Sequence, residues 1–181
     1  EAAKTFGDAE RYADAYRGAL DRIAKEAKNG FKKDPGISVK LTALHPRYEF
    51  THAEEAVAAV LPVVRELALK ASKADVHLTI DAEEADRLEL QMDVFEALLA
   101  DDELFANGWG GFGIAIQAYQ KRAAPLCDWA AEAARAESTM ESWLCSVTQT
   151  AALAGIVVAQ ARPPPSARPI TWRSRSVPRS S

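Results

Sequence analysis

Three short apolar runs, each ending in a polar residue and each followed by helix-like sequence, constrain the fold of this chain most. The runs end at Lys40, Asp81 and Gln117. Successive ends lie roughly 40 residues apart, which is the size of one strand-helix unit with its loops. In parallel α/β barrels, the working side chains stand where strands meet the loops that lead into the next helices. The spacing therefore predicts consecutive βα units with a site distributed over three strand ends.

The segments between these runs carry apolar residues at helical spacing. We expect helices over residues 8–28, 51–71, 82–99 and 121–136, and strands over residues 37–41, 76–80 and 112–118. Thr51 and Glu54 have the spacing of a capping box at the start of the second helix, and Pro62 within it predicts a kink or a local break. Pro125 fits only the first turn of the last helix. This alternation of strands and helices is typical of parallel α/β architecture.

The length of the chain limits how much of a barrel it can form. A complete eight-stranded α/β barrel takes roughly 250 residues, whereas this chain has 181. The sequence therefore predicts an α/β fold, either a partial (βα)8 barrel with parallel strands followed by an irregular C-terminal tail, or a different architecture. Hydrophobic residues make up 48% of the chain, so we expect a packed core. The net charge of -4 argues against a dedicated nucleic-acid-binding protein.

The cysteines and histidines indicate neither a metal centre nor a disulfide framework. Cys127 and Cys145 lack CxxC spacing, and His45, His52 and His77 lack the spacing of metal ligands. We therefore expect no metal site and a reducing, cytoplasmic environment. The N-terminal residues do not have the pattern of a secretion signal, and no apolar run approaches the length of a membrane span.

The composition changes in residues 137–181. The last acidic residue is Glu141 and the last lysine is Lys121, and arginine, proline and serine dominate the sequence that follows. The apolar stretch at residues 151–161 fits a short helix or a strand, and we expect the remainder of this segment to be irregular. One hypothesis for the change is a shifted reading frame or a truncated gene, which the sequence of the source DNA would test.

Three segments of the chain resemble motifs of one family, in the same order. They are residues 36–48 (GISVKLTALHPRY), 78–89 (LTIDAEEADRLE) and 113–122 (GIAIQAYQKR). Together they resemble the proline dehydrogenase domain of bifunctional proline utilization A (PutA) flavoproteins. The resemblance divides the chain into a partial proline dehydrogenase barrel at residues 1–136 and a tail outside the family pattern at residues 137–181.

The resemblance implies an FAD-dependent enzyme that oxidises L-proline to pyrroline-5-carboxylate, with hydride transfer to the flavin and a membrane quinone as electron acceptor. It also implies a cytoplasmic location, peripheral to the inner membrane in the full-length parent. By resemblance, Lys40 binds the proline carboxylate, Asp81 belongs to the substrate pocket and Gln117 lies against FAD. No catalytic residue is assigned, because the flavin carries the hydride chemistry. Motifs of the family's later strands are not found here, so we expect the fragment to be inactive alone.

Each of these residues also has a purely structural interpretation. Lys40 offers a flexible point charge for a carboxylate, but a lysine at a strand end can equally pair with a neighbouring acid. Asp81 can orient a substrate amine or cap the following helix. Gln117 has both a donor and an acceptor for a flavin edge, although a glutamine alone is weak support. Glu83 and Glu84 are expected on the polar side or in the first turn of that helix.

Two other functions remain open at this point. The chain can be a non-enzymatic interaction fragment whose Arg/Pro-rich tail binds an anionic partner such as a nucleic acid, and such binding would fall steeply with salt. Loss of that binding on deletion of residues 162–181 would favour this alternative. Another α/β barrel enzyme is a more distant third interpretation.

Overall fold

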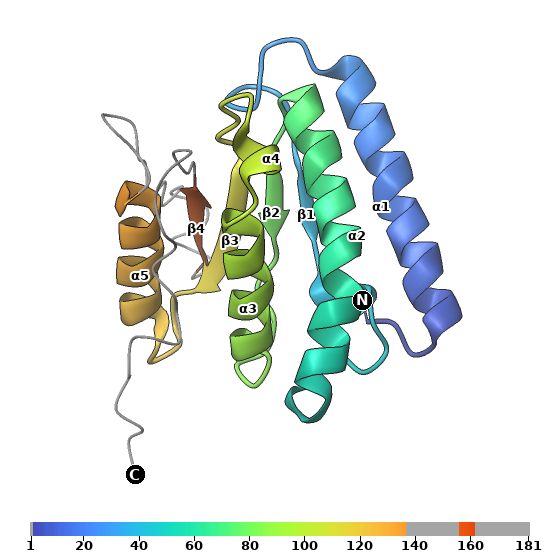
Figure 1. Ribbon diagram of the computed structural model, residues 1–181, viewed down its shortest axis with the longest axis vertical. Coiled ribbons are helices and arrows are strands. Elements are labelled where there is room, and N and C mark those ends of the chain that lie inside the picture. Colours follow the sequence, from blue (N-terminus) through green and yellow to red (C-terminus); the bar gives the residue numbers. More distant parts are fainter. Residues whose placement is uncertain (1, 137–155, 162–181) are drawn as a thin grey trace.

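The computed structural model describes residues 2–136 and 156–161. In Figure 1, helices form a layer in front of a sheet, and the first helix lies at one side of that layer. None of the helices in these ranges combines the length and apolar character that a membrane span needs. In chain order the elements are α1 (Phe6–Glu26), β1 (Ile37–Val39), η1 (Leu41–Ala43), η2 (Phe50–His52), α2 (Ala53–Ala74), β2 (Leu78–Ile80), α3 (Leu88–Leu99), α4 (Asp102–Phe105), β3 (Phe112–Gln117), α5 (Ala123–Ala136) and β4 (Ile156–Ala161).

The sheet places strands that follow each other in the chain side by side, in the order β1-β2-β3-β4. Strands β1, β2 and β3 run parallel, and Val39, Ile80 and Ile114 stand opposite one another across them. Helix α2 connects β1 to β2, and helices α3 and α4 connect β2 to β3. The predicted parallel α/β arrangement is therefore confirmed for three strands.

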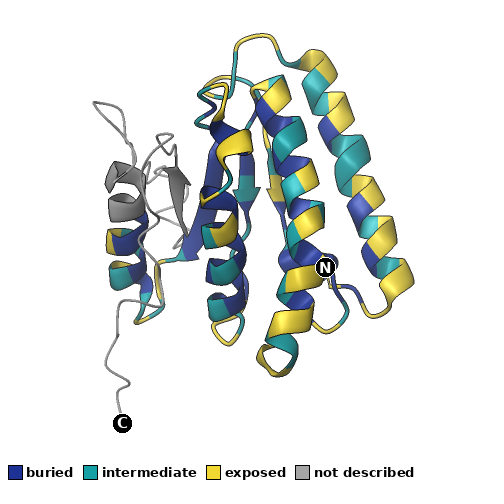
Figure 2. Cartoon of the chain, viewed as in Figure 1, coloured by how far each residue is buried: buried dark blue, intermediate teal, exposed yellow. Residues whose placement is uncertain are grey.

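The helices cover one face of the sheet. Phe112 of β3 stacks on Phe95 of α3 with ring centroids 5.1 Å apart, and Phe95 lies 6.0 Å from Trp129 of α5. Figure 2 shows that buried residues concentrate on the strands and on the helix sides that face them. Because side chains alternate along a strand, Ser38 and Thr79 point to the opposite face, where Ser38 is exposed. That second face is the one on which the site residues lie.

Strand β4 differs from the parallel pattern. It pairs antiparallel with β3, with Phe112 opposite Ala161 and Gln117 opposite Ile156. The sequence left a helix and a strand open for the apolar stretch at residues 151–161, and residues 156–161 form the strand. Its direction departs from the expected parallel arrangement, because the free edge of a strand can pair with a neighbour in either direction. The rest of the predicted tail, including the Arg/Pro-rich residues 162–181, lies outside the described residues.

Several helix boundaries differ from those predicted. The capping box is at α1, where Thr5 accepts from the Asp8 amide and Asp8 accepts from the Thr5 amide. The capping box predicted at Thr51 is wrong, since the short η2 helix precedes α2 and no side chain caps α2. Helix α2 continues through Pro62, so the predicted local break does not occur. Pro125 lies in the first turn of α5, as expected.

The amino ends of β1 and β2 approach closely at Gly36. The Ile37 amide donates to the His77 carbonyl at 2.9 Å. A Cβ added at Gly36 would lie 2.3 Å from the Cβ of His77, which only glycine avoids. This contact sets the register of the two strands, and that register decides which residues meet at their carboxyl ends.

Candidate functional site

The carboxyl ends of β1 and β2 bring Lys40 and Asp81 together. The Lys40 Nζ lies 2.9 Å from Asp81 Oδ2, and the two side chains are 38% and 28% exposed. Both residues come directly after register partners, Val39 and Ile80, so alternation places their side chains on the face that the helices leave uncovered. The structure thus joins two of the three predicted site residues at one edge of the sheet.

The backbone amides of both residues of this pair are hydrogen-bonded, one to β1 and one to α1. The Asp81 amide donates to the Val39 carbonyl at 2.9 Å. The Lys40 amide donates to the hydroxyl of Tyr16 on α1 at 3.1 Å. The hydrogen bond to Asp81 raises the pKa of Lys40 above its usual value, while partial burial acts in the opposite direction. Lys40 therefore carries its positive charge throughout the neutral pH range.

Gln117 lies on the same face of the sheet but further along its strand. Ala115 follows Ile114 as Asp81 follows Ile80, so Gln117 stands two residues beyond the level of the ion pair. Its Oε1 accepts a hydrogen bond from the side-chain amide of Gln120, in the turn that leads to α5. The structure therefore places Gln117 at the predicted edge, where its side chain is hydrogen-bonded to Gln120 in the following turn and not to the Lys40–Asp81 pair.

Two buried polar side chains that the sequence did not indicate support this edge. Gln91 of α3 is 1% exposed, and its amide nitrogen lies 3.1 Å from the Asp81 carbonyl and 3.4 Å from the Ala115 carbonyl. Glu83 is buried in the loop after β2 and accepts hydrogen bonds from Thr42. The expectation that Glu83 lies on the polar side of the helix is wrong, because α3 begins only at Leu88.

The loop after β1 carries a buried hydroxyl, that of Tyr48, whose pKa is influenced by the Glu83 carboxylate. Tyr48 is 3% exposed, and its hydroxyl has no hydrogen-bond partner among the described residues. Burial raises the pKa of Tyr48, and the negative charge of Glu83 acts in the same direction. Tyr48 is therefore neutral at neutral pH and packs within the hydrophobic core. Tyr119, after β3, is exposed.

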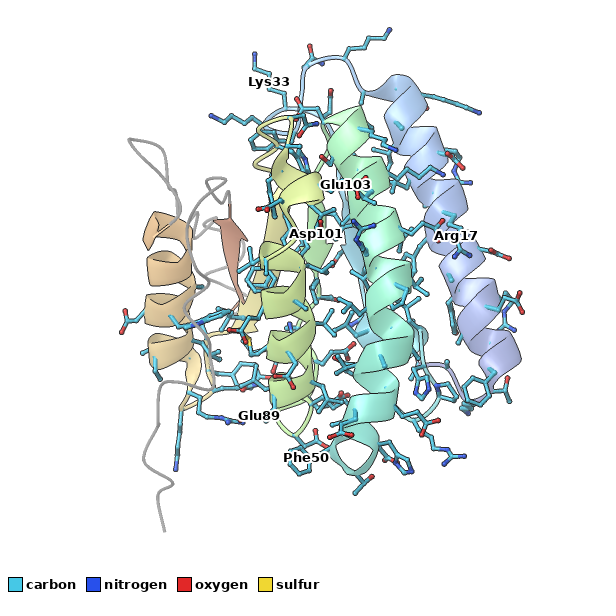
Figure 3. The ribbon with its side chains drawn as sticks, viewed as in Figure 1. Arg17, Lys33, Phe50, Glu89, Asp101 and Glu103 are labelled. Carbon is cyan, nitrogen blue, oxygen red and sulfur yellow. The ribbon has the colours of Figure 1, made fainter. Side chains whose placement is uncertain are left out.

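Figure 3 marks the two ends of the sheet. Glu89 and Phe50 lie at the end where the loops after β1 and β2 gather, whereas Lys33 lies at the opposite end. At the first of these ends, Arg122 Nη1 pairs with Glu89 Oε1 at 2.7 Å and joins the turn after β3 to α3. An ion pair thus connects the turn after β3 to the first turn of α3 at the end of the sheet that carries the candidate site.

The structural interpretations of the two charged residues have different outcomes. Helix capping by Asp81 is wrong, because the residue before α3 is Arg87 and the Asp81 side chain accepts from the amide of Ala82. An ion pair of Lys40 at the sheet edge is confirmed, and it is what both the structural and the substrate-binding interpretation predict. The substrate role of Lys40 therefore stays a prediction. Chemically, an adjacent cation and anion on a partly exposed edge can bind a small zwitterion.

The residues at the end of β3 fit the edge of a flavin ring. Gln117 is only partly buried and offers a donor and an acceptor at the end of its strand. Gly113 and Ala115 precede it on the same face, and neither has a side chain large enough to keep a flat ring away from the sheet. Two small residues followed by a polar one, Gln117, suit the edge of an isoalloxazine ring.

Comparison with known proteins gives a consistent result. A family model described as proline dehydrogenase matches residues 1–142. The bifunctional protein PutA of Rhizobium meliloti is 47% identical over 131 residues, which are 72% of this chain and 10% of that protein. The PutA protein of Escherichia coli (strain K12) is 42% identical over 130 residues, 71% of this chain and 10% of that protein. The chain thus spans a tenth of the length of these relatives.

Solved structures agree in fold as well as in sequence. A crystal structure of a Bradyrhizobium japonicum proline utilization A variant is 51% identical, with a TM-score of 0.67 over 71% of this chain and 13% of that chain. A structure of proline utilization A with proline bound in remote sites is also 51% identical, with a TM-score of 0.70 over 75% of this chain and 14% of that chain. With its strand order, its motifs and a family model matched over residues 1–142, the chain belongs to the proline dehydrogenase family.

Proposed function

We propose that this chain supplies the substrate-binding strand ends of an FAD-dependent proline dehydrogenase, which oxidises L-proline to pyrroline-5-carboxylate. The observation that carries the proposal is the ion pair of Lys40 with Asp81 at the carboxyl edge of parallel strands, on the face that the helices leave uncovered. Membership of the family and the similarity to PutA proteins support it.

The charges of proline match this pair. Proline is a zwitterion at neutral pH, with one carboxylate and one protonated amine. The Lys40 ammonium binds the carboxylate, and Asp81 orients the amine and holds Lys40 in place when no substrate is bound. Because the two side chains are only partly exposed, their charges are screened less than those of a fully exposed pair.

Gln117 holds the polar edge of the flavin, and the bound FAD supplies the acceptor for the hydride. We also propose that the three parallel strands belong to an eight-stranded α/β barrel whose interior is the face carrying Lys40 and Asp81. Sites of such barrels lie at the carboxyl ends of the strands, where this pair is found. For the full-length parent we expect a cytoplasmic enzyme that passes its electrons to a membrane quinone.

A chimeric enzyme tests the proposal. The aligned segment of the Rhizobium meliloti PutA protein is replaced by the matching residues of this chain. We expect the purified chimera to retain FAD and to reduce a dye when L-proline is added. The 181-residue chain alone, given FAD and L-proline, is expected to give no turnover, because three parallel strands form only part of a barrel pocket. A chimera that binds FAD but does not oxidise proline would contradict the proposed function.

A further inference from the structure

Glu83 is the one acidic side chain that is buried among the residues whose side chains the structure describes, at 7% exposed. Its Oε1 accepts from the amide and from the hydroxyl of Thr42, both at 3.0 Å, and its Oε2 lies 3.2 Å from the same hydroxyl. An ionised carboxylate is costly to bury unless hydrogen bonds compensate it. The hydrogen bonds from Thr42 provide this compensation.

The bonds of Glu83 continue the contacts around the ion pair. On one side of Lys40, the Val39 carbonyl accepts from the Asp81 amide at 2.9 Å. On the other side, Thr42 donates to Glu83, which lies two residues after Asp81. The backbone of Lys40 is therefore joined to the loop after β2 both before and after Lys40 itself.

We propose that Glu83 is a positioning residue, which holds the chain after β1 against the loop after β2 so that the Lys40 ammonium stays beside Asp81. A lysine has a long flexible stem and a head that acts as a point charge, so the place of its backbone decides where the charge lies. The inference rests on the proposed function, in which this ammonium binds the proline carboxylate.

The titration of Lys40 measures this positioning without any substrate. The hydrogen bond to Asp81 is the main reason that the pKa of Lys40 lies above its usual value. Glu83→Ala and Glu83→Gln both remove the negative charge of Glu83, but only glutamine keeps an oxygen that can accept from Thr42. A difference between the two variants therefore reports the hydrogen bonds and not the charge.

We expect NMR titration of labelled lysine in the full 181-residue chain to separate the variants. In Glu83→Ala the pKa of Lys40 falls to the value found in Asp81→Asn, and in Glu83→Gln it stays above that value. Equal Lys40 pKa values in Glu83→Ala and Glu83→Gln would overturn the inference. Should Glu83→Ala not fold, Thr42→Val and Thr42→Ser test the hydroxyl bond alone, since both keep the amide that donates to Glu83 and only serine keeps the hydroxyl; a Lys40 pKa lower in Thr42→Val than in Thr42→Ser supports the inference, and equal values count against it.

A control separates positioning from loss of stability. Ser72→Ala removes a buried hydroxyl that donates to the Leu104 carbonyl at 2.8 Å, close to the amino end of β2. This variant is expected to lower stability and leave the pKa of Lys40 unchanged. A Ser72→Ala change that lowers the Lys40 pKa as much as Glu83→Ala does would also overturn the inference, because the titration would then follow stability alone.

The chimera adds a readout for substrate. We expect the KM for L-proline to rise about tenfold in Glu83→Ala and to be restored in Glu83→Gln. Failure of the proposed function is seen as an inactive, FAD-loaded chimera with Glu83 intact. Failure of the inference is seen in the Lys40 titrations, which require neither proline nor FAD.

Discussion

Glu83 makes the stability of the fold depend on pH, because its pKa differs between the folded and the unfolded state. Burial raises the pKa of Glu83 above the usual glutamate value, while the hydrogen bonds from Thr42 act in the opposite direction. The folded state therefore binds this proton more tightly than the unfolded state. The resulting stabilisation is fully present below the unfolded-state pKa and is lost as the pH rises through the folded-state pKa.

This sign gives a prediction for Glu83→Gln, which does not titrate. As the pH falls from about 7 to about 4, the free energy of unfolding of the unsubstituted chain should rise relative to that of Glu83→Gln. Urea unfolding of both proteins at a series of pH values measures the difference. A difference that changes in the opposite direction would mean that the hydrogen bonds from Thr42, and not burial, dominate the pKa of Glu83.

The charged residues of the site differ in how far sequence predicts them. Lys40 and Asp81 could be expected to meet, because the carboxyl ends of neighbouring parallel strands lie at one edge. The contact of Glu83 could not be predicted, since its partner Thr42 lies in η1, 41 residues earlier, and nothing local distinguishes Glu83 from the neighbouring Glu84. The contacts of the uncharged Gln91 were equally hard to predict, because its acceptors are the backbone carbonyls of Asp81, just after β2, and of Ala115 in β3.

At the scale of elements, the approach of β1 to β2 sets the geometry of the site. Gly36 is the residue that permits this approach, since an added Cβ would also lie 2.6 Å from the His77 carbonyl oxygen. We expect Gly36→Ala to destabilise the chain by about 1–3 kcal/mol, because both contacts are with atoms that the strand pairing holds in place. Thermal or urea unfolding measures the change.

The same substitution elsewhere provides a matched control. Gly18 lies in α1, and the nearest atom to an added Cβ is the Arg22 Nη1 at 3.8 Å, an ordinary contact distance. Gly18→Ala should therefore stabilise the chain, by about 0.5–1 kcal/mol, through helix propensity. Equal effects of the two substitutions would contradict the close packing of β1 on β2.

The sequence predicts where the helices and strands lie more accurately than it predicts the residues at which they begin and end. The strands agree with the apolar runs because the helix-covered face of each strand carries large apolar residues such as Val39, Ile80 and Ile114. The box at Thr5 and Asp8 was open to prediction from the same spacing as Thr51 and Glu54, but spacing alone does not show which serine or threonine begins a helix. The direction of β4 was not predictable, because pairing with the edge of β3 depends on tertiary contacts.

At the scale of the whole molecule, the fold separates a packed side from a polar edge. In Figure 1, α2 and α3 lie in front of the sheet, with α1 and α5 at the two sides, and the ion pair of Arg17 with Glu66 joins α1 to α2. The face of the sheet that the helices leave uncovered carries Lys40 and Asp81, at the carboxyl ends of β1 and β2. In the barrel proposed for the parent enzyme this face would turn inward, and that position would account for the polar and small residues that it carries in place of the large apolar residues of the helix-covered face.

The most direct test of the account is the rate of anaerobic flavin reduction by L-proline in the chimera and in its Lys40→Met form. Lys70→Met is the matched control, since the Lys70 Nζ pairs with Asp21 at 2.6 Å between α1 and α2, away from the sheet edge. We expect the Lys40→Met chimera to keep its FAD, and that flavin to be reduced about 100-fold more slowly at a given proline concentration. The Lys70→Met chimera should keep the unsubstituted rate. An unchanged rate in Lys40→Met would contradict the central claim that this edge binds the proline carboxylate.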